Sequence, residues 1–194
     1  ILKGKKLISS NNSKDNGEEL HNLMSEVIRD QLIADVPVGA FLSGGIDSSF
    51  VTALMQEQSS SKVNTYSISF EDKRYDESKY AADVANHLGT DHHSMFVTSK
   101  SLLNVVPNLP KIYDEPFADS SQIPSYLVSK YAAESVKVVL TGDGADELFG
   151  GYNRYLLLND YWKRLSALPF QFRKIISNLL DYVSEDNINS FSNI

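Results

Sequence analysis

Between Glu18 and Leu140 the apolar residues follow two spacings in turn, one typical of amphipathic helices and one typical of buried strands. From Glu18 to about Ala34, apolar side chains recur every three or four residues, which predicts a helix with one buried face. Pro37 ends this pattern because the residue before a proline avoids the helical region. Short runs rich in β-branched and apolar residues then predict four strands, at Val38–Leu42, Val63–Phe70, His92–Val97 and Val136–Leu140.

Helical patterns separate these strands. They begin after Gly45, near Glu77, at Ser99 (continuing to Tyr113) and near Gln122. Tyr80 is expected on the buried face of the second of these helices. Strands that alternate with helices predict an α/β fold with three layers, in which a mostly parallel sheet carries helices on both faces.

Polar stretches near the two ends set the expected domain limits. Residues 1–17 contain the polar run Ser9–Gly17 and are expected to be a linker remnant, followed by one compact domain at 18–165. Residues 166–194 are expected to form a helical extension whose apolar face needs a partner surface. Because the chain starts at Ile1 without Met and ends in polar residues, we expect it to be cut from a longer polypeptide.

Composition narrows the class of protein. The net charge of -7 argues against a nucleic-acid surface that works by neutralising many phosphates. The absence of cysteine excludes disulfides, zinc-thiolate sites and a thiol nucleophile, and it fits a reducing compartment. No apolar run reaches membrane-spanning length, so we expect a cytoplasmic protein with no membrane partner.

The stretch from Ser43 to Ser49 joins a buried strand to a helix through two glycines. Glycines there allow the backbone to approach a ligand closely, and the amides at a helix N-terminus form an anion site. The stretch lacks the lysine of the common phosphate loop and carries Asp47 instead. A cation between Asp47 and a bound phosphate would remove the charge conflict.

A second acidic stretch, Thr141–Tyr152, follows the fourth strand and contains no Lys or Arg. In open parallel sheets, ligands bind beyond the carboxyl ends of strands where the connections diverge. If the first and fourth strands are neighbours, Asp47 and Asp146 face one crevice. Carboxylates at a phosphate site indicate Mg²⁺, which proteins hold through one or two carboxylates and substrate phosphates.

These motifs carry a family resemblance. Ser43-Gly44-Gly45-Ile46-Asp47-Ser48 resembles the pyrophosphate loop of ATP pyrophosphatases, and its pairing with Asp114-Glu115-Pro116 and Thr141–Tyr152 resembles the synthetase domain of glutamine-hydrolysing asparagine synthetases. The resemblance runs from about Glu18 to Tyr155. It implies an adenine nucleotide alpha hydrolase-like fold and a ligase that uses ATP and Mg²⁺ to activate the aspartate side chain as an acyl adenylate for amidation by ammonia.

The resemblance also implies roles for individual residues. Asp47 and Asp146 hold the metal, and Asp143, where some relatives have Glu, assists ammonia attack. Glu115 and Asp119 help to shape the amino-acid pocket. The residues expected to bind the nucleotide are Phe41, Leu42, Ser43, Gly44, Gly45, Asp47, Ser48, Ser49, Ile68, Thr141 and Gly142.

Two departures from the family pattern bear on activity. The amino-terminal glutaminase domain of the family, with its cysteine nucleophile, is absent from this sequence, so glutamine-dependent activity is not expected of the chain by itself. The lysine that the family uses downstream of Gly-Gly-Tyr is not matched. The oligomeric state is left open, with a homodimer as one option.

Other interpretations remain beside the leading one. A related amidotransferase or cyclase would adenylate another carboxylate, and a degenerate module would bind nucleotide without catalysis. His87, His92 and His93 lack acidic or cysteine companions at ligand spacing, so we interpret them as packing or surface residues.

Overall fold

The computed structural model describes residues 13–180. The chain divides into two compact units, Ile1–Asp143 and Gly144–Ile194. This division does not test the domain limits expected at residues 17 and 165, which stay predictions. Among the residues described, no helix is long and apolar enough to cross a membrane.

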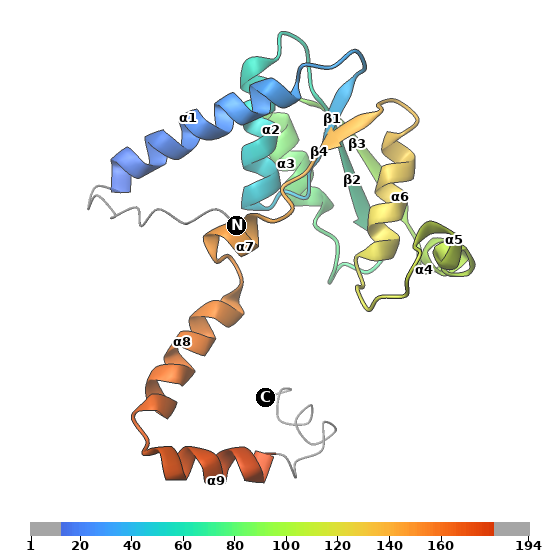
Figure 1. Cartoon of the computed structure of the whole chain (residues 1–194). Coiled ribbons are helices and arrows are strands. Elements are labelled where there is room, and N and C mark those ends of the chain that lie inside the picture. Colours follow the sequence, from blue (N-terminus) through green and yellow to red (C-terminus); the bar gives the residue numbers. More distant parts are fainter. Residues whose placement is uncertain (1–12, 181–194) are drawn as a thin grey trace. The chain divides into compact units, whose positions relative to one another are not determined.

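The first unit is built on a parallel four-stranded sheet (Figure 1). Its strands are β1 (Val38–Phe41), β2 (Asn64–Phe70), β3 (Asp91–Val97) and β4 (Val138–Leu140), in the order β3-β2-β1-β4. Ala40 at the centre of β1 is aligned with Thr65 on one side and Leu140 on the other. All four predicted strands are therefore confirmed to within two residues, and β1 and β4 are neighbours.

Helices cover both faces of this sheet, as the sequence predicts (Figure 1). The helices of the unit are α1 (Ser13–Gln31), α2 (Ile46–Gln58), α3 (Ser78–Leu88), α4 (Ser99–Val105), the 3-10 turn η1 (Val106–Asn108), α5 (Leu109–Ile112) and α6 (Gln122–Ala132). Side chains alternate across β1, so that Ala40 packs with α1 and α2 and Leu42, just beyond the strand, packs with α3. Phe41 points the other way and packs against the cluster containing Ala132 of α6.

Three details of the predicted helices are wrong. Helix α1 begins at Ser13 rather than Glu18, because apolar periodicity detects only the turns that touch a core. Tyr80 is 65% exposed rather than buried. The single helix expected at Ser99–Tyr113 is three short pieces, since Pro107 and Pro110 have no amide hydrogen to continue a helix.

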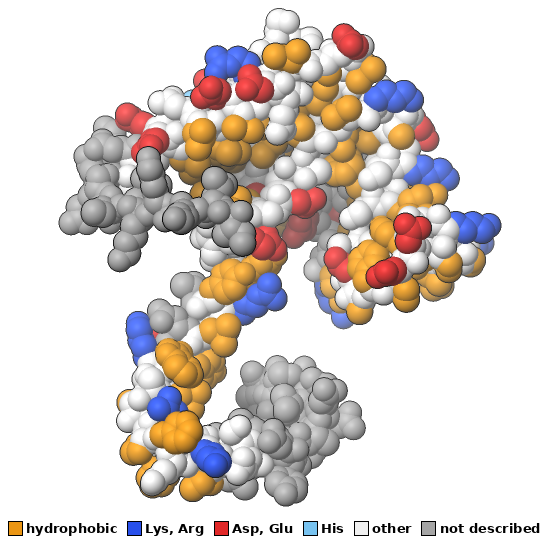
Figure 2. Space-filling model, in the orientation of Figure 1, with side chains coloured by type: hydrophobic (Ala, Val, Ile, Leu, Met, Phe, Trp, Pro, Cys, Tyr) orange, Lys and Arg blue, Asp and Glu red, His pale blue; other side chains and the backbone are white. Residues whose placement is uncertain are grey.

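The second unit consists of helices among the residues described. They are α7 (Ala145–Phe149), α8 (Asn153–Ser166) and α9 (Phe170–Leu180). Large apolar side chains on α8 and α9 are exposed, among them Tyr155, Leu158, Trp162, Phe172 and Ile175 (Figure 2). The need of residues 166–194 for a partner surface stays a prediction. Residues 1–12 of the expected linker and the polar residues that end the chain lie outside the described residues.

Candidate functional site

The turn between β1 and α2 is shaped by a glycine and a serine pair. Gly44 has a φ of +85°, and a Cβ there would come within 2.6 Å of the Ala81 backbone nitrogen, so only glycine fits. The hydroxyl oxygens of Ser43 and Ser48 lie 3.0 Å apart. The Ser48 Oγ also accepts the Ser43 amide at 3.3 Å, which closes the turn on itself.

The N-terminus of α2 keeps hydrogen-bonding capacity for an anion. Its N-cap, Gly45, provides no side-chain cap, so the first amides of the helix have no carboxylate or hydroxyl cap of their own. The Ser49 hydroxyl is buried and has no hydrogen-bond partner among the described residues. Thr52, fully buried, donates to the Ser48 carbonyl at 2.7 Å and braces the first turn. This arrangement suits a phosphate group.

The loop after β4 lies against the same turn. A Cβ on Gly142 would come within 2.7 Å of the Ser48 nitrogen and 2.9 Å of the Asp47 carbonyl carbon. Successive strands run from β1 to β2 to β3 on one side while β4 lies on the other, so connections diverge between β1 and β4. The sheet therefore brings Gly142, at the start of the second motif, against the Ser43–Ser49 turn at the position where α/β sheets bind ligands.

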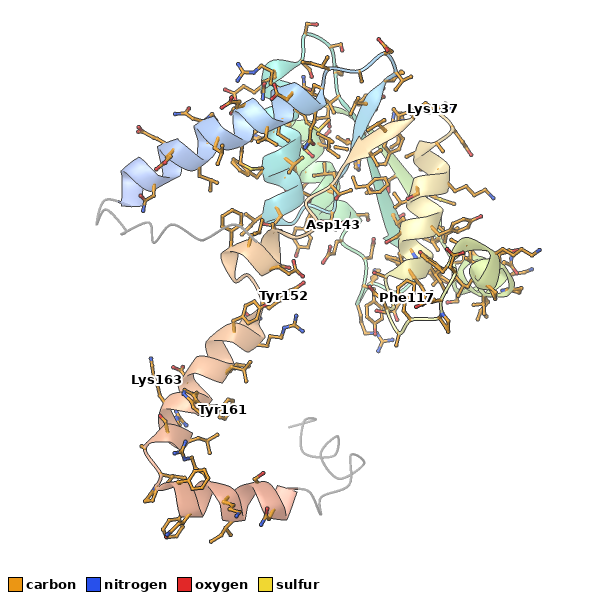
Figure 3. All side chains as sticks on the ribbon, in the orientation of Figure 1. Phe117, Lys137, Asp143, Tyr152, Tyr161 and Lys163 are labelled. Carbon is orange, nitrogen blue, oxygen red and sulfur yellow. The ribbon has the colours of Figure 1, made fainter. Side chains whose placement is uncertain are left out.

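The Thr141–Asp143 turn is held by its own side chains. The Thr141 hydroxyl donates to the Asp143 carboxylate at 3.0 Å and accepts the Asp143 amide at 3.3 Å. Asp143 is exposed and lies at the end of the loop that follows β4 (Figure 3). Its carboxylate is thus both oriented and open to solvent.

Three predicted nucleotide-binding residues point their side chains into the core. Leu42 is 1% exposed and packs with α3, while Phe41 and Ile68 pack in two further apolar clusters. The Leu42 amide donates to the Tyr66 carbonyl at 2.9 Å. Phe41 and Ile68 can therefore contribute to a ligand site chiefly through backbone groups.

The loop before α6 carries the two predicted pocket residues, Glu115 and Asp119, and both are exposed. The Asp119 carboxylate accepts the Ser121 amide at 2.8 Å, and this hydrogen bond lowers the pKa of Asp119. Asp119 thus helps to start α6. Contact of either residue with a substrate stays a prediction.

Asp146 belongs to the second unit, on α7, so its pairing with Asp47 stays a prediction. Beside it, Tyr152 donates a 2.6 Å hydrogen bond to Glu147, which raises the pKa of Tyr152 to about 12 and lowers that of Glu147. Sequence reasoning missed this pair and the Arg154 side chain stacked on it. The motif places these residues close in sequence, but only the turn at Gly150 brings their side chains together.

The histidines of β3 pack within the protein. His92 Nδ1 lies 2.9 Å from the Thr65 hydroxyl, and partial burial, aided by the charge of His93, lowers the pKa of His92. His93 stacks on Tyr66 with ring centroids 5.2 Å apart. No group of three His, Asp or Glu side chains within the described range could hold a metal ion.

Comparisons with the sequences of known proteins point to one family, that of asparagine synthase. The protein-family model of asparagine synthase matches residues 19–192. The putative glutamine-hydrolysing asparagine synthetase 2 of Methanocaldococcus jannaschii is 45% identical over 140 residues, which cover 72% of this chain and 27% of that protein. The glutamine-hydrolysing asparagine synthetase 1 of Bacillus subtilis is 40% identical over 154 residues, which cover 79% of this chain and 23% of that protein.

The chain spans about a quarter of the length of these curated relatives. Among solved structures, the ammonia-dependent NAD synthetase of Campylobacter jejuni matches with a TM-score of 0.50 at 18% identity, over 70% of this chain and 60% of that one. At this identity the match bears on the fold alone. It supports the adenine nucleotide alpha hydrolase-like fold that the resemblance implied.

Proposed function

The chain belongs to the asparagine synthase family, and from that premise we propose that it forms the ATP-activating part of a longer glutamine-hydrolysing asparagine synthetase. The side-chain carboxylate of aspartate attacks the α-phosphorus of ATP, and pyrophosphate leaves. Ammonia then attacks the acyl carbon and displaces AMP, giving asparagine. The names of both curated relatives support this assignment.

The contact between the Gly142 backbone and the first turn of α2 carries this proposal. A phosphate loop by itself is common to many nucleotide-binding proteins. Here the Gly142 backbone, from a distant part of the chain, lies against the loop at Asp47 and Ser48. Adenylation needs such a pairing, because one element must hold the departing pyrophosphate while another orients the reacting groups.

In this reaction the turn after β1 holds pyrophosphate. The Gly45 amide and the hydroxyls of Ser43, Ser48 and Ser49 donate to its oxygens, and the buried Ser49 hydroxyl gains the partner that it lacks. These donors stabilise the charge that develops on the leaving group, which is the main contribution a fixed site makes to phosphoryl chemistry. Backbone groups of Phe41, Leu42 and Ile68 line the adenosine site together with Thr141 and Gly142.

In this proposal the carboxylates of Asp47 and Asp146 are the protein ligands of Mg²⁺, since proteins usually hold this ion through one or two carboxylates and substrate phosphates. The half-buried Asp47 in the first turn of α2 would otherwise repel the phosphate that the helix N-terminus attracts. Asp47 and Asp146 would hold a magnesium ion, which would supply positive charge to the pyrophosphate oxygens. A three-residue cluster is not needed, because the phosphates provide further ligands.

Other residues act on the two remaining reactants, ammonia and aspartate. Asp143, oriented by the Thr141 hydroxyl, takes a proton from the attacking ammonia. Glu115 and Asp119 help to shape the aspartate pocket. The remaining length of the enzyme supplies, in this proposal, the glutaminase domain that releases ammonia, so the chain by itself does not convert glutamine into asparagine.

Exchange of labelled pyrophosphate into ATP tests the proposal on the full-length protein. We expect exchange that requires aspartate and Mg²⁺. Exchange that requires a different carboxylic acid would instead identify a related adenylating amidotransferase or cyclase. No exchange with any acid would support a nucleotide-binding module without catalysis.

A substitution at Asp146 tests whether this residue holds the metal. Asp146→Ala should abolish exchange while leaving the circular dichroism spectrum unchanged. Asp160→Ala, which removes an exposed carboxylate from α8, is the matched control and should keep exchange near the parental rate. Retained exchange in Asp146→Ala would show that Asp146 does not hold the metal.

A further inference from the structure

The turn between α7 and α8 is held from two sides through one aromatic ring. The Tyr152 hydroxyl donates to Glu147 Oε1 at 2.6 Å. The Arg154 guanidinium lies 4.2 Å from the centre of the Tyr152 ring, within the range of a cation–π contact. Tyr155 meets the same ring edge to face at 5.6 Å. Figure 3 shows Tyr152 where the chain passes from α7 to α8.

The same turn packs against Asp146. Gly150 has a φ of +69°, a left-handed conformation that favours glycine, and the Gly151 amide donates to the Asp146 carbonyl at 3.0 Å. A Cβ on Gly151 would collide with the Asp146 carboxylate. The backbone at Gly151 thus limits the positions open to the Asp146 side chain, and Tyr152 follows directly.

The adjacent carboxylates of Asp146 and Glu147 differ in their hydrogen bonds. Glu147 accepts the Tyr152 hydroxyl, whereas no donor among the described residues bonds to the Asp146 carboxylate. A carboxylate that already accepts a short hydrogen bond has fewer lone pairs for a cation. The unbonded neighbour keeps all of them.

We propose that Tyr152 and Arg154 are positioning residues that hold Glu147 in a structural hydrogen bond and so leave Asp146 as the metal ligand of this turn. Arg154 acts by fixing the plane of the Tyr152 ring, and Tyr152 acts by directing the Glu147 carboxylate. The assignment of a metal to Asp146 rests on the proposed function. The division of roles between the two carboxylates goes beyond it.

Binding of Mn²⁺, used as a spectroscopic probe for Mg²⁺, tests this division without a need for turnover. Free Mn²⁺ is counted by electron paramagnetic resonance in the full-length protein with a non-hydrolysable ATP analogue. Tyr152→Phe keeps the ring but loses the hydroxyl, so it releases the Glu147 carboxylate as an alternative ligand. Asp146→Asn should therefore cost less Mn²⁺ binding in the Tyr152→Phe background than in the parent. The matched control, Tyr155→Phe, should bind like the parent.

Conservative variants of the carboxylates complete the test. Glu147→Gln keeps an oxygen that accepts the Tyr152 hydroxyl and should bind Mn²⁺ like the parent, whereas Asp146→Asn should lose most binding. The proposal would be overturned if Asp146→Asn cost the same Mn²⁺ binding in the Tyr152→Phe background as in the parent, or if Glu147→Gln and Asp146→Asn lost binding equally. Aspartate-dependent pyrophosphate exchange, measured on the same samples, reports separately on the proposed function.

Discussion

Gly142→Ala is the most local perturbation of the contact between the two motif loops. The added methyl group would lie 2.7 Å from the Ser48 nitrogen, where ordinary contact begins near 3.4 Å, so the loops must separate by about 0.7 Å. The opposing atoms are backbone at the start of α2 and cannot rotate away. Overpacking of this kind typically costs about 1–3 kcal/mol of unfolding free energy.

The same displacement moves the phosphate donors. A misplacement of about 1 Å in a reacting site can cost roughly a hundredfold in rate, so we expect Gly142→Ala to slow pyrophosphate exchange by about tenfold or more. Urea unfolding and pyrophosphate exchange of the full-length variant measure the two effects. The reasoning would be refuted if Gly142→Ala matched the parent in both stability and exchange rate.

A matched alanine substitution elsewhere separates steric conflict from a general effect of losing glycine. Gly17 lies in α1, and a Cβ there meets no atom within 4 Å. Gly17→Ala should therefore stabilise the protein by roughly 0.5–1 kcal/mol, because alanine loses less backbone entropy in a helix. The rate of pyrophosphate exchange should not change.

Further predictions concern three other positions. Gly44→Ala should destabilise more than Gly142→Ala in urea unfolding, since it adds left-handed backbone strain to a 2.6 Å clash with Ala81. Burial lowers the pKa of His92, so the unfolded chain binds the proton of this residue more tightly than the folded protein does. Free energy of unfolding that is present above pH 6.5 should therefore be lost as the pH falls below 6.5. The free energy of unfolding of His92→Gln should depend less on pH. Asp143→Asn should keep aspartate-dependent exchange but make asparagine from ammonia more slowly, as product assays would show.

The sheet and the turn after β1 were predictable because their signals are local. Each strand is a short apolar run between polar loops, and the two glycines Gly44 and Gly45 lie where β1 leads into α2. The neighbouring positions of β1 and β4, which the sequence left conditional, follow from long-range pairing such as Ala40 with Leu140. The contact of Gly142 with α2 depends on that pairing.

Features that depend on side-chain direction or on polar surfaces were not predictable in the same way. The first turns of α1 contain exposed polar residues, so no apolar repeat reveals that the helix begins at Ser13. The Glu147–Tyr152–Arg154 stack forms because the chain reverses at Gly150, and spacing along the sequence does not specify this reversal.

The central claim is that the aspartate carboxylate attacks the α-phosphorus of ATP. Aspartate labelled with ¹⁸O in its side-chain carboxylate tests it directly, using the full-length protein, ATP, Mg²⁺ and ammonia, with mass spectrometry of the nucleotide product. The account predicts one ¹⁸O atom in AMP, left there when ammonia breaks the acyl–oxygen bond. Label in inorganic phosphate with ADP as the product, or AMP formed without label, would contradict it.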